Sequence, residues 1–77
     1  MATVTAPEAP SAELPASSWS AQLAGLKSRG ASDQDSRVLR CRAALAYHRA
    51  LRVIDAEADR LDPADAAALA ARLTGGA

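Results

Sequence analysis

One thiol and one imidazole are the side chains best suited to chemistry. They are Cys41 and His48, the only cysteine and the only histidine of the chain. Such a pair could form a nucleophile with its base, or bind zinc. Seven residues along one helix separate the two positions by about 10.5 Å, whereas zinc lies about 2.0–2.3 Å from each ligand. Because a nucleophile must also touch its base, this spacing predicts neither a metal site nor a Cys–His pair.

Two pairs of carboxylates could also do acid–base work or hold a metal ion. Asp55 and Asp59 lie four residues apart, and Asp62 and Asp65 lie three apart. The second pair is explained by the capping of a helix that begins at Pro63. The sequence contains no phosphate-binding glycine loop, nucleophile elbow or zinc-hydrolase motif. We therefore expect no enzyme, with no cofactor, no metal and no small-molecule substrate.

Arginines form the third group. Arg42, Arg49 and Arg60 project from nearly one line of a long predicted helix, with Arg52 beside them. A row of arginines neutralises phosphates, so one hypothesis is a small nucleic-acid-binding regulator that uses Arg42, Arg49 and Arg52. The net charge of zero argues against it, because nucleic-acid-binding domains usually carry a basic excess.

Positive and negative charge are separated along the chain. Residues 27–52 carry seven basic groups against two acids, and residues 53–77 carry five acids against two basic groups. Two copies set antiparallel would place residues 37–52 of one beside residues 55–65 of the other, in a two-fold arrangement. The alternative is that these charges are simply solvated, since exposed ion pairs contribute little.

Caps and apolar periodicity predict the elements that position these residues. Trp19, Leu23 and Leu26 share one stripe of a helix over about 18–29, which Gly30 ends. From there no glycine or proline interrupts the chain before Pro63, which predicts a helix over about 33–61 and about 42 Å long. A third helix follows over about 63–73, with proline in its first turn.

The long helix has two apolar stripes. We expect the short helices to cover the broader stripe, the first on its first half and the third on its second half. This broader stripe contains Leu39, Ala43, Ala46, Ala50, Val53, Ile54 and Leu61. The smaller stripe, roughly opposite, is the candidate interface with another molecule. It consists of Val38, Cys41 and Leu45, edged by Arg49 and Arg52. The alternative is a set of ordinary exposed apolar residues.

The ends of the chain differ from its middle. Residues 1–16 hold three of the four prolines and little apolar surface, which predicts a flexible N-terminal arm. Residues 75–77 form a C-terminal tail. The fold class expected is all-α, with three helices within residues 17–74: one long central helix flanked by two short ones, preceded by a disordered Pro/Ala-rich arm.

A core this small usually needs a disulfide, a metal or a partner, and Cys41 alone cannot close an intrachain bridge. We therefore expect a non-catalytic protein–protein interaction module. It would self-associate as a homodimer or dock on a larger assembly through the long helix. The unpaired thiol, with no secretory segment and no membrane-spanning run, favours the cytoplasm. The abundance of alanine and arginine favours a GC-rich genome, such as that of an actinobacterium or one of its phages.

Overall fold

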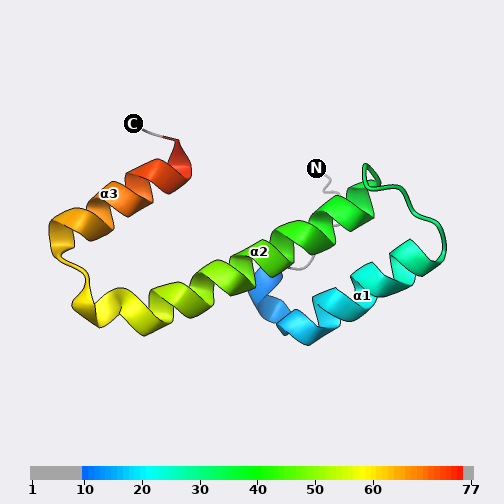
Figure 1. Cartoon of the computed structure of the whole chain (residues 1–77), viewed down its shortest axis with the longest axis horizontal. Coiled ribbons are helices and arrows are strands. Elements are labelled where there is room, and N and C mark those ends of the chain that lie inside the picture. The colour runs from blue at the N-terminus through cyan, green and yellow to red at the C-terminus, as the bar shows by residue number, and fades with distance from the viewer. Residues whose placement is uncertain (1–9, 76–77) are drawn as a thin grey trace, which may run out of the picture.

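A computed structural model of the chain describes residues 10–75 (Figure 1). It contains the α-helices α1 (Ala16–Ser28), α2 (Ser36–Glu57) and α3 (Pro63–Thr74). The 3-10 helix η1 (Ser11–Glu13) precedes α1, and η2 (Ala58–Arg60) continues α2. No strand occurs within the described residues. The predicted all-α class, with one long central helix and two short ones, is confirmed.

The N-terminal arm was predicted over residues 1–16, and the structure differs from this in its last part. Residues 1–9 lie outside the described residues, whereas η1 and the first residue of α1 occupy positions 11–16. The indole Nε1 of Trp19 donates a hydrogen bond to the carbonyl oxygen of Ser11 at 3.1 Å. Arg40 also donates to the hydroxyl of Ser11, at 3.1 Å. These bonds fix η1 against α1 and α2.

The first helix ends as the sequence predicts. Gly30 has a φ of 88°, a left-handed conformation that glycine adopts without a Cβ clash. The N–H of Gly30 donates to the carbonyl of Lys27, and the N–H of Ala31 donates to that of Leu26, each at 3.0 Å. This pair of bonds is a Schellman motif, and Ala31 packs against the core beside Leu26.

The second helix begins three residues later than predicted, at Ser36 instead of residue 33. The carboxylate of Asp35 caps it by accepting a hydrogen bond from the backbone N–H of Arg37 at 2.8 Å. The hydroxyl of Ser32 accepts instead from the backbone N–H of Gln34, inside the preceding turn. Because its 22 residues rise about 1.5 Å each, α2 is about 33 Å long.

The third helix lies where the sequence places it. Asp62 occupies the N-cap position, although its side chain makes no capping hydrogen bond, and Pro63 is the first helical residue. Gly75, with a φ of 75°, ends the helix. Proline at the start and glycine just past the end are therefore sufficient to locate α3.

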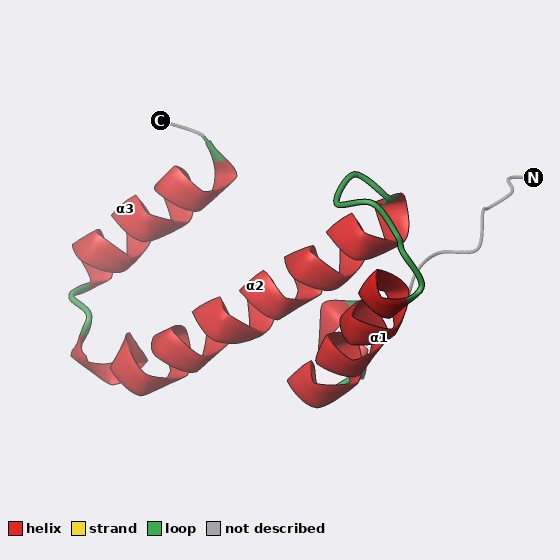
Figure 2. Cartoon of the chain, turned by 45° about the vertical axis from the view of Figure 1, so that its right-hand side comes forward, coloured by secondary structure: helices red, strands yellow, loops and turns green. Residues whose placement is uncertain are grey.

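The core lies between α1 and the first half of α2 (Figure 2). Leu14, Leu23, Ala31 and Leu45 pack against it, half-buried. Its buried members are Trp19, Leu26, Val38, Cys41 and Ala44. In both views α3 lies on the opposite side of α2 from α1, and no residue of α3 is buried. The predicted packing of α1 on the first half of α2 is thus confirmed, whereas the predicted burial of α3 on the second half is wrong.

Candidate interaction surface

The structure buries the smaller apolar stripe of α2 and leaves the broader stripe exposed, which is the reverse of the prediction. Val38 and Cys41, assigned to a contact surface, are 0% and 2% exposed and face α1, and Leu45 is half-buried beside them. These three residues therefore belong to the core and offer no open surface. Arg49 and Arg52, the other members of that candidate interface, are exposed.

The part of the broader stripe that lies on α2 remains open, whereas Leu61 follows η2 and is half-buried. We call it the uncovered face of α2. Val53 and Ile54 are its most exposed large aliphatic side chains, at 60% and 51%. Every member is exposed, and the face comprises Leu39, Ala43, Ala46, Tyr47, Ala50, Val53 and Ile54. Contiguous exposed apolar surface of this kind marks sites of interaction more often than scattered single residues do.

The third helix adds apolar surface to this side of the molecule. Leu69 and Leu73 of α3 are 56% and 82% exposed. The helix α3 lies on the opposite side of α2 from α1 (Figure 1). Since the buried residues of α2 pack with α1, we infer that α3 and the uncovered face lie on the same side of α2. The second half of α2 and all of α3 thus form an amphipathic hairpin without a core of its own.

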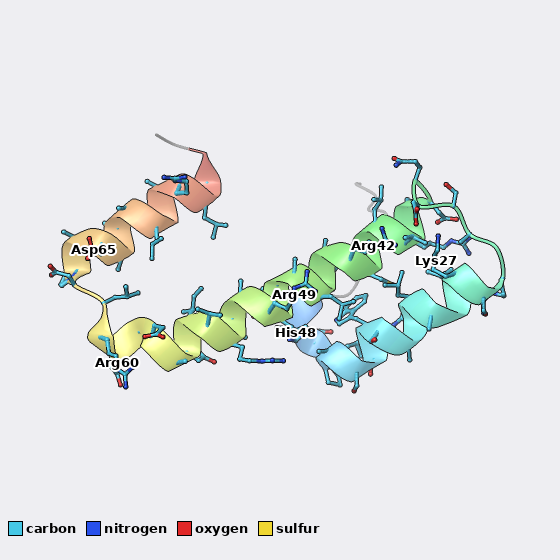
Figure 3. The ribbon with its side chains drawn as sticks, viewed as in Figure 1. Lys27, Arg42, His48, Arg49, Arg60 and Asp65 are labelled. Carbon is cyan, nitrogen blue, oxygen red and sulfur yellow. The ribbon has the colours of Figure 1, made fainter. Side chains whose placement is uncertain are left out.

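Charged residues near the loop between α1 and α2 are already paired. The carboxylate of Asp33 lies 2.7 Å from Lys27 Nζ and 3.2 Å from an Arg42 guanidinium nitrogen, so it links both helices (Figure 3). The two cations lower the pKa of Asp33, with the hydrogen bond from Lys27 as the main cause. Arg42, a residue of the candidate nucleic-acid set, is therefore engaged within the chain.

Farther along α2 the charges are unpaired or only weakly paired within the described part of the chain. Arg49 and Arg52 are exposed and make no ion pair there. Glu57 contacts Arg60 at 3.8 Å, and both side chains are more than half exposed. This part of α2 therefore combines open apolar surface with open charge of both signs.

The histidine and the cysteine have structural positions. His48 Nε2 lies 2.9 Å from the carbonyl oxygens of both Ser11 and Leu14. Because carbonyl oxygens only accept, this nitrogen carries the proton and donates to them. Cys41 is buried in the core. Among the described residues, no group of three or more His, Cys, Asp or Glu lies close enough to hold a metal ion.

A groove of about 590 Å³ runs between α1 and α2. Trp19, Leu26 and Cys41 line its apolar part. Two of the three arginines along it contact other groups: the Arg40 guanidinium lies 4.7 Å from the centre of the Trp19 ring, and Arg37 binds Asp35, whereas Arg29 lines the rim. The groove is therefore the outer side of the core.

The cap of α2 makes stability depend on pH in acid. The side chain of Arg37, followed by its backbone N–H, lowers the pKa of Asp35 from 3.8 to about 2. Because the folded-state pKa is below the ordinary value, the carboxylate stabilises the fold above about pH 4, and this contribution is lost as the pH falls towards about 2. We expect the thermal midpoint of the wild-type protein to fall across this window.

The matched variant for this prediction is Asp35→Asn, which retains a capping side chain but cannot ionise. Thermal midpoints from circular dichroism at pH 2, 3, 4 and 5 should fall less in this variant than in the wild-type protein. Asp33 also titrates with a lowered pKa, and it does so in both proteins. Parallel curves for the two proteins would contradict a stabilising role of the Asp35 carboxylate.

Comparison with protein-family models, with curated proteins and with solved structures finds no match to this chain. In the part of the chain that the structure describes, no helix has the length and apolar character needed to cross a membrane.

Proposed function

We propose that this protein is a non-catalytic protein–protein interaction module that receives a further helix on the uncovered face of α2. The helix would come from a second copy or from a component of a larger assembly. The observation that carries this proposal is the exposure of Val53 and Ile54 on a helix of which only the first half packs, by its other side, against α1. Apolar helix surface is normally buried against another element, and the described residues contain none that covers this face.

The third helix supports the same proposal. Helices of about 12 residues are marginal in water without tertiary packing, and α3 has 12 residues with none buried. Its leucines gain apolar neighbours only when another molecule lies against this side of the protein. If the second half of α2 and α3 bury their apolar residues only against another molecule, the absence of a core in this hairpin is explained.

The positions of the reactive side chains are compatible with a role that is not catalytic. Cys41 is buried, and His48 Nε2 is occupied by two carbonyl oxygens. We also propose a cytoplasmic location, where reducing conditions keep an unpaired thiol in its free form.

Affinity capture from the native cells tests the module. Tagged wild-type protein should retain a specific protein, either an untagged copy of itself or another component identified by mass spectrometry. Val53→Asp should reduce this capture at least about tenfold, because it places a charge in the contact. Ala24→Asp is the matched control, since Ala24 is exposed on α1 and lies outside the uncovered face. Capture that is equal for both variants, or no capture by the wild-type protein, would contradict the proposal.

A second candidate function is nucleic-acid binding through Arg42, Arg49 and Arg52. The exposure of Arg49 and Arg52, without acidic partners among the described residues, favours it. Binding of this kind weakens steeply with salt, and replacement of all three arginines by alanine should abolish it. Gel shifts at low salt that show no complex with DNA or RNA would exclude this alternative.

A further inference from the structure

We infer that the uncovered face of α2 binds a second copy of this chain, with the two α2 helices antiparallel and the two-fold axis beside Val53. This inference rests on the proposed function and names its partner. It differs from an antiparallel pairing through Val38, Cys41 and Leu45, because the structure buries that stripe under α1. Two-fold pairs of this kind are the commonest symmetric assemblies of soluble proteins.

The first argument concerns the shape of the surface around Val53. In an antiparallel pair with its axis at Val53, residues equally far before and after this position face one another. Val53 then meets its own copy, and Ala50 faces Ala56 of the other chain. Because both alanines are exposed and small, they allow the two helix axes to approach closely. Val53, the most exposed large aliphatic residue of α2, thus lies where a symmetric contact needs it.

The second argument concerns charge. Arg49 lies one turn before Val53 and Glu57 lies one turn after it, so both are on the same side of the helix. The antiparallel arrangement places each Arg49 beside the other copy's Glu57, and symmetry makes this pair twice. Arg49 has no ion pair within the described residues, and the contact of Glu57 with Arg60 is long and exposed. A parallel pair in the same register would set Arg49 beside Arg49, which is repulsive.

The third argument concerns α3. It lies on the opposite side of α2 from α1, which covers the other face of α2, and its Leu69 and Leu73 are exposed. A second α2 that lies on this side meets apolar side chains from both helices of the hairpin. Two such hairpins then bury their open surfaces together, as pairs of helical hairpins do in four-helix bundles.

The position of the axis is tested by crosslinking. A residue beside the two-fold axis lies close to its own copy, so Val53→Cys should form a disulfide-linked dimer under mild oxidation. Ala24→Cys, on the exposed side of α1, should stay uncrosslinked under the same conditions. The native Cys41 is buried and does not contribute to the product. Equal crosslinking of the two variants, or none of Val53→Cys, would overturn this register.

The pairing of charges is tested by reversal and mixing. Wild-type protein should sediment near the mass of two chains at high micromolar concentration. Arg49→Glu alone and Glu57→Arg alone should each weaken self-association at least about tenfold, because like charges then face each other. An equimolar mixture of the two variants should sediment again as two chains, since both facing pairs are restored.

A double variant, Ser20→Glu with Ala24→Glu, tests whether a change in net charge by itself weakens self-association. It changes the net charge by the same amount as Arg49→Glu, on exposed positions of α1, and should dimerise as the wild-type protein does. A mixture that fails to recover dimer would overturn the antiparallel pairing. A wild-type protein that stays monomeric at several hundred micromolar would overturn the inference that the partner is a second copy of this chain. The proposed function would then still stand if capture from native cells retains another protein and depends on Val53.

Discussion

Replacement of Val38 by Asp is expected to unfold the α1–α2 core, whereas the same replacement of Val53 leaves it folded. Val38 is 0% exposed and Val53 is 60% exposed, although both are valines of one helix. Because Val38 is fully buried, a carboxylate at this position is removed from water, which costs roughly 3–5 kcal/mol. A small domain has a total stability only slightly above this range.

Circular dichroism of dilute samples measures this difference, because dilution removes any contribution from association. Val38→Asp should lose most of its helical signal at 25 °C, and Val53→Asp should keep a thermal midpoint within a few degrees of the wild-type value. The reverse result would show that α1 packs on the broader stripe after all. It would also remove the uncovered face on which the proposed function depends.

The substitution Trp19→Ala is expected to cause the second large loss of stability. The indole is 4% exposed, it donates to the carbonyl of Ser11, and the Arg40 guanidinium lies over its ring. Truncation of a buried Trp to Ala costs about 3–5 kcal/mol, through lost burial and the cavity that remains. Here it also leaves η1 without one of the bonds that hold it. We expect the variant to be largely unfolded at 25 °C.

Trp19→Phe separates the two contributions, since it keeps an apolar ring but lacks the N–H donor. Its thermal midpoint should lie between those of the wild-type protein and Trp19→Ala. Digestion of folded Trp19→Phe by a protease should be faster in the segment before α1 than in the wild-type protein. A helical signal and midpoint that are unchanged in Trp19→Ala would refute the anchoring role of this side chain.

Much of the local structure could be predicted because it depends on neighbours in sequence. Gly30 and Gly75 end helices in left-handed conformations, and Pro63 begins one, as each residue type requires. The predicted start of α2 is three residues too early because both Ser32 and Asp35 are good caps. Only the fold shows that the hydroxyl of Ser32 is used inside the turn while Asp35 binds Arg37.

The choice of the packed stripe could not be predicted from apolar periodicity. The broader stripe of α2 has more apolar residues, which favours its burial when only periodicity is counted. The side that packs on α1 instead carries His48 and Arg40, whose donors bind the segment around Ser11. Ala44 is 0% exposed and belongs to the core between α1 and α2. The partners are the Ser11 hydroxyl for Arg40 and backbone carbonyls for His48. Such partners in a proline-rich segment leave no periodic signal in the sequence, so apolar periodicity alone does not predict that this side is buried.

The uneven packing along α2 has a consequence for how the protein opens. Its first half shares a core with α1, so its amides exchange with solvent deuterium only when that core separates. Its second half and α3 are held mainly by local helical bonds, so their amides exchange through fraying that leaves the core intact. One continuous helix should therefore show slow exchange at one end and fast exchange at the other. Raising the protein concentration should slow the fast end alone, if a second copy docks there.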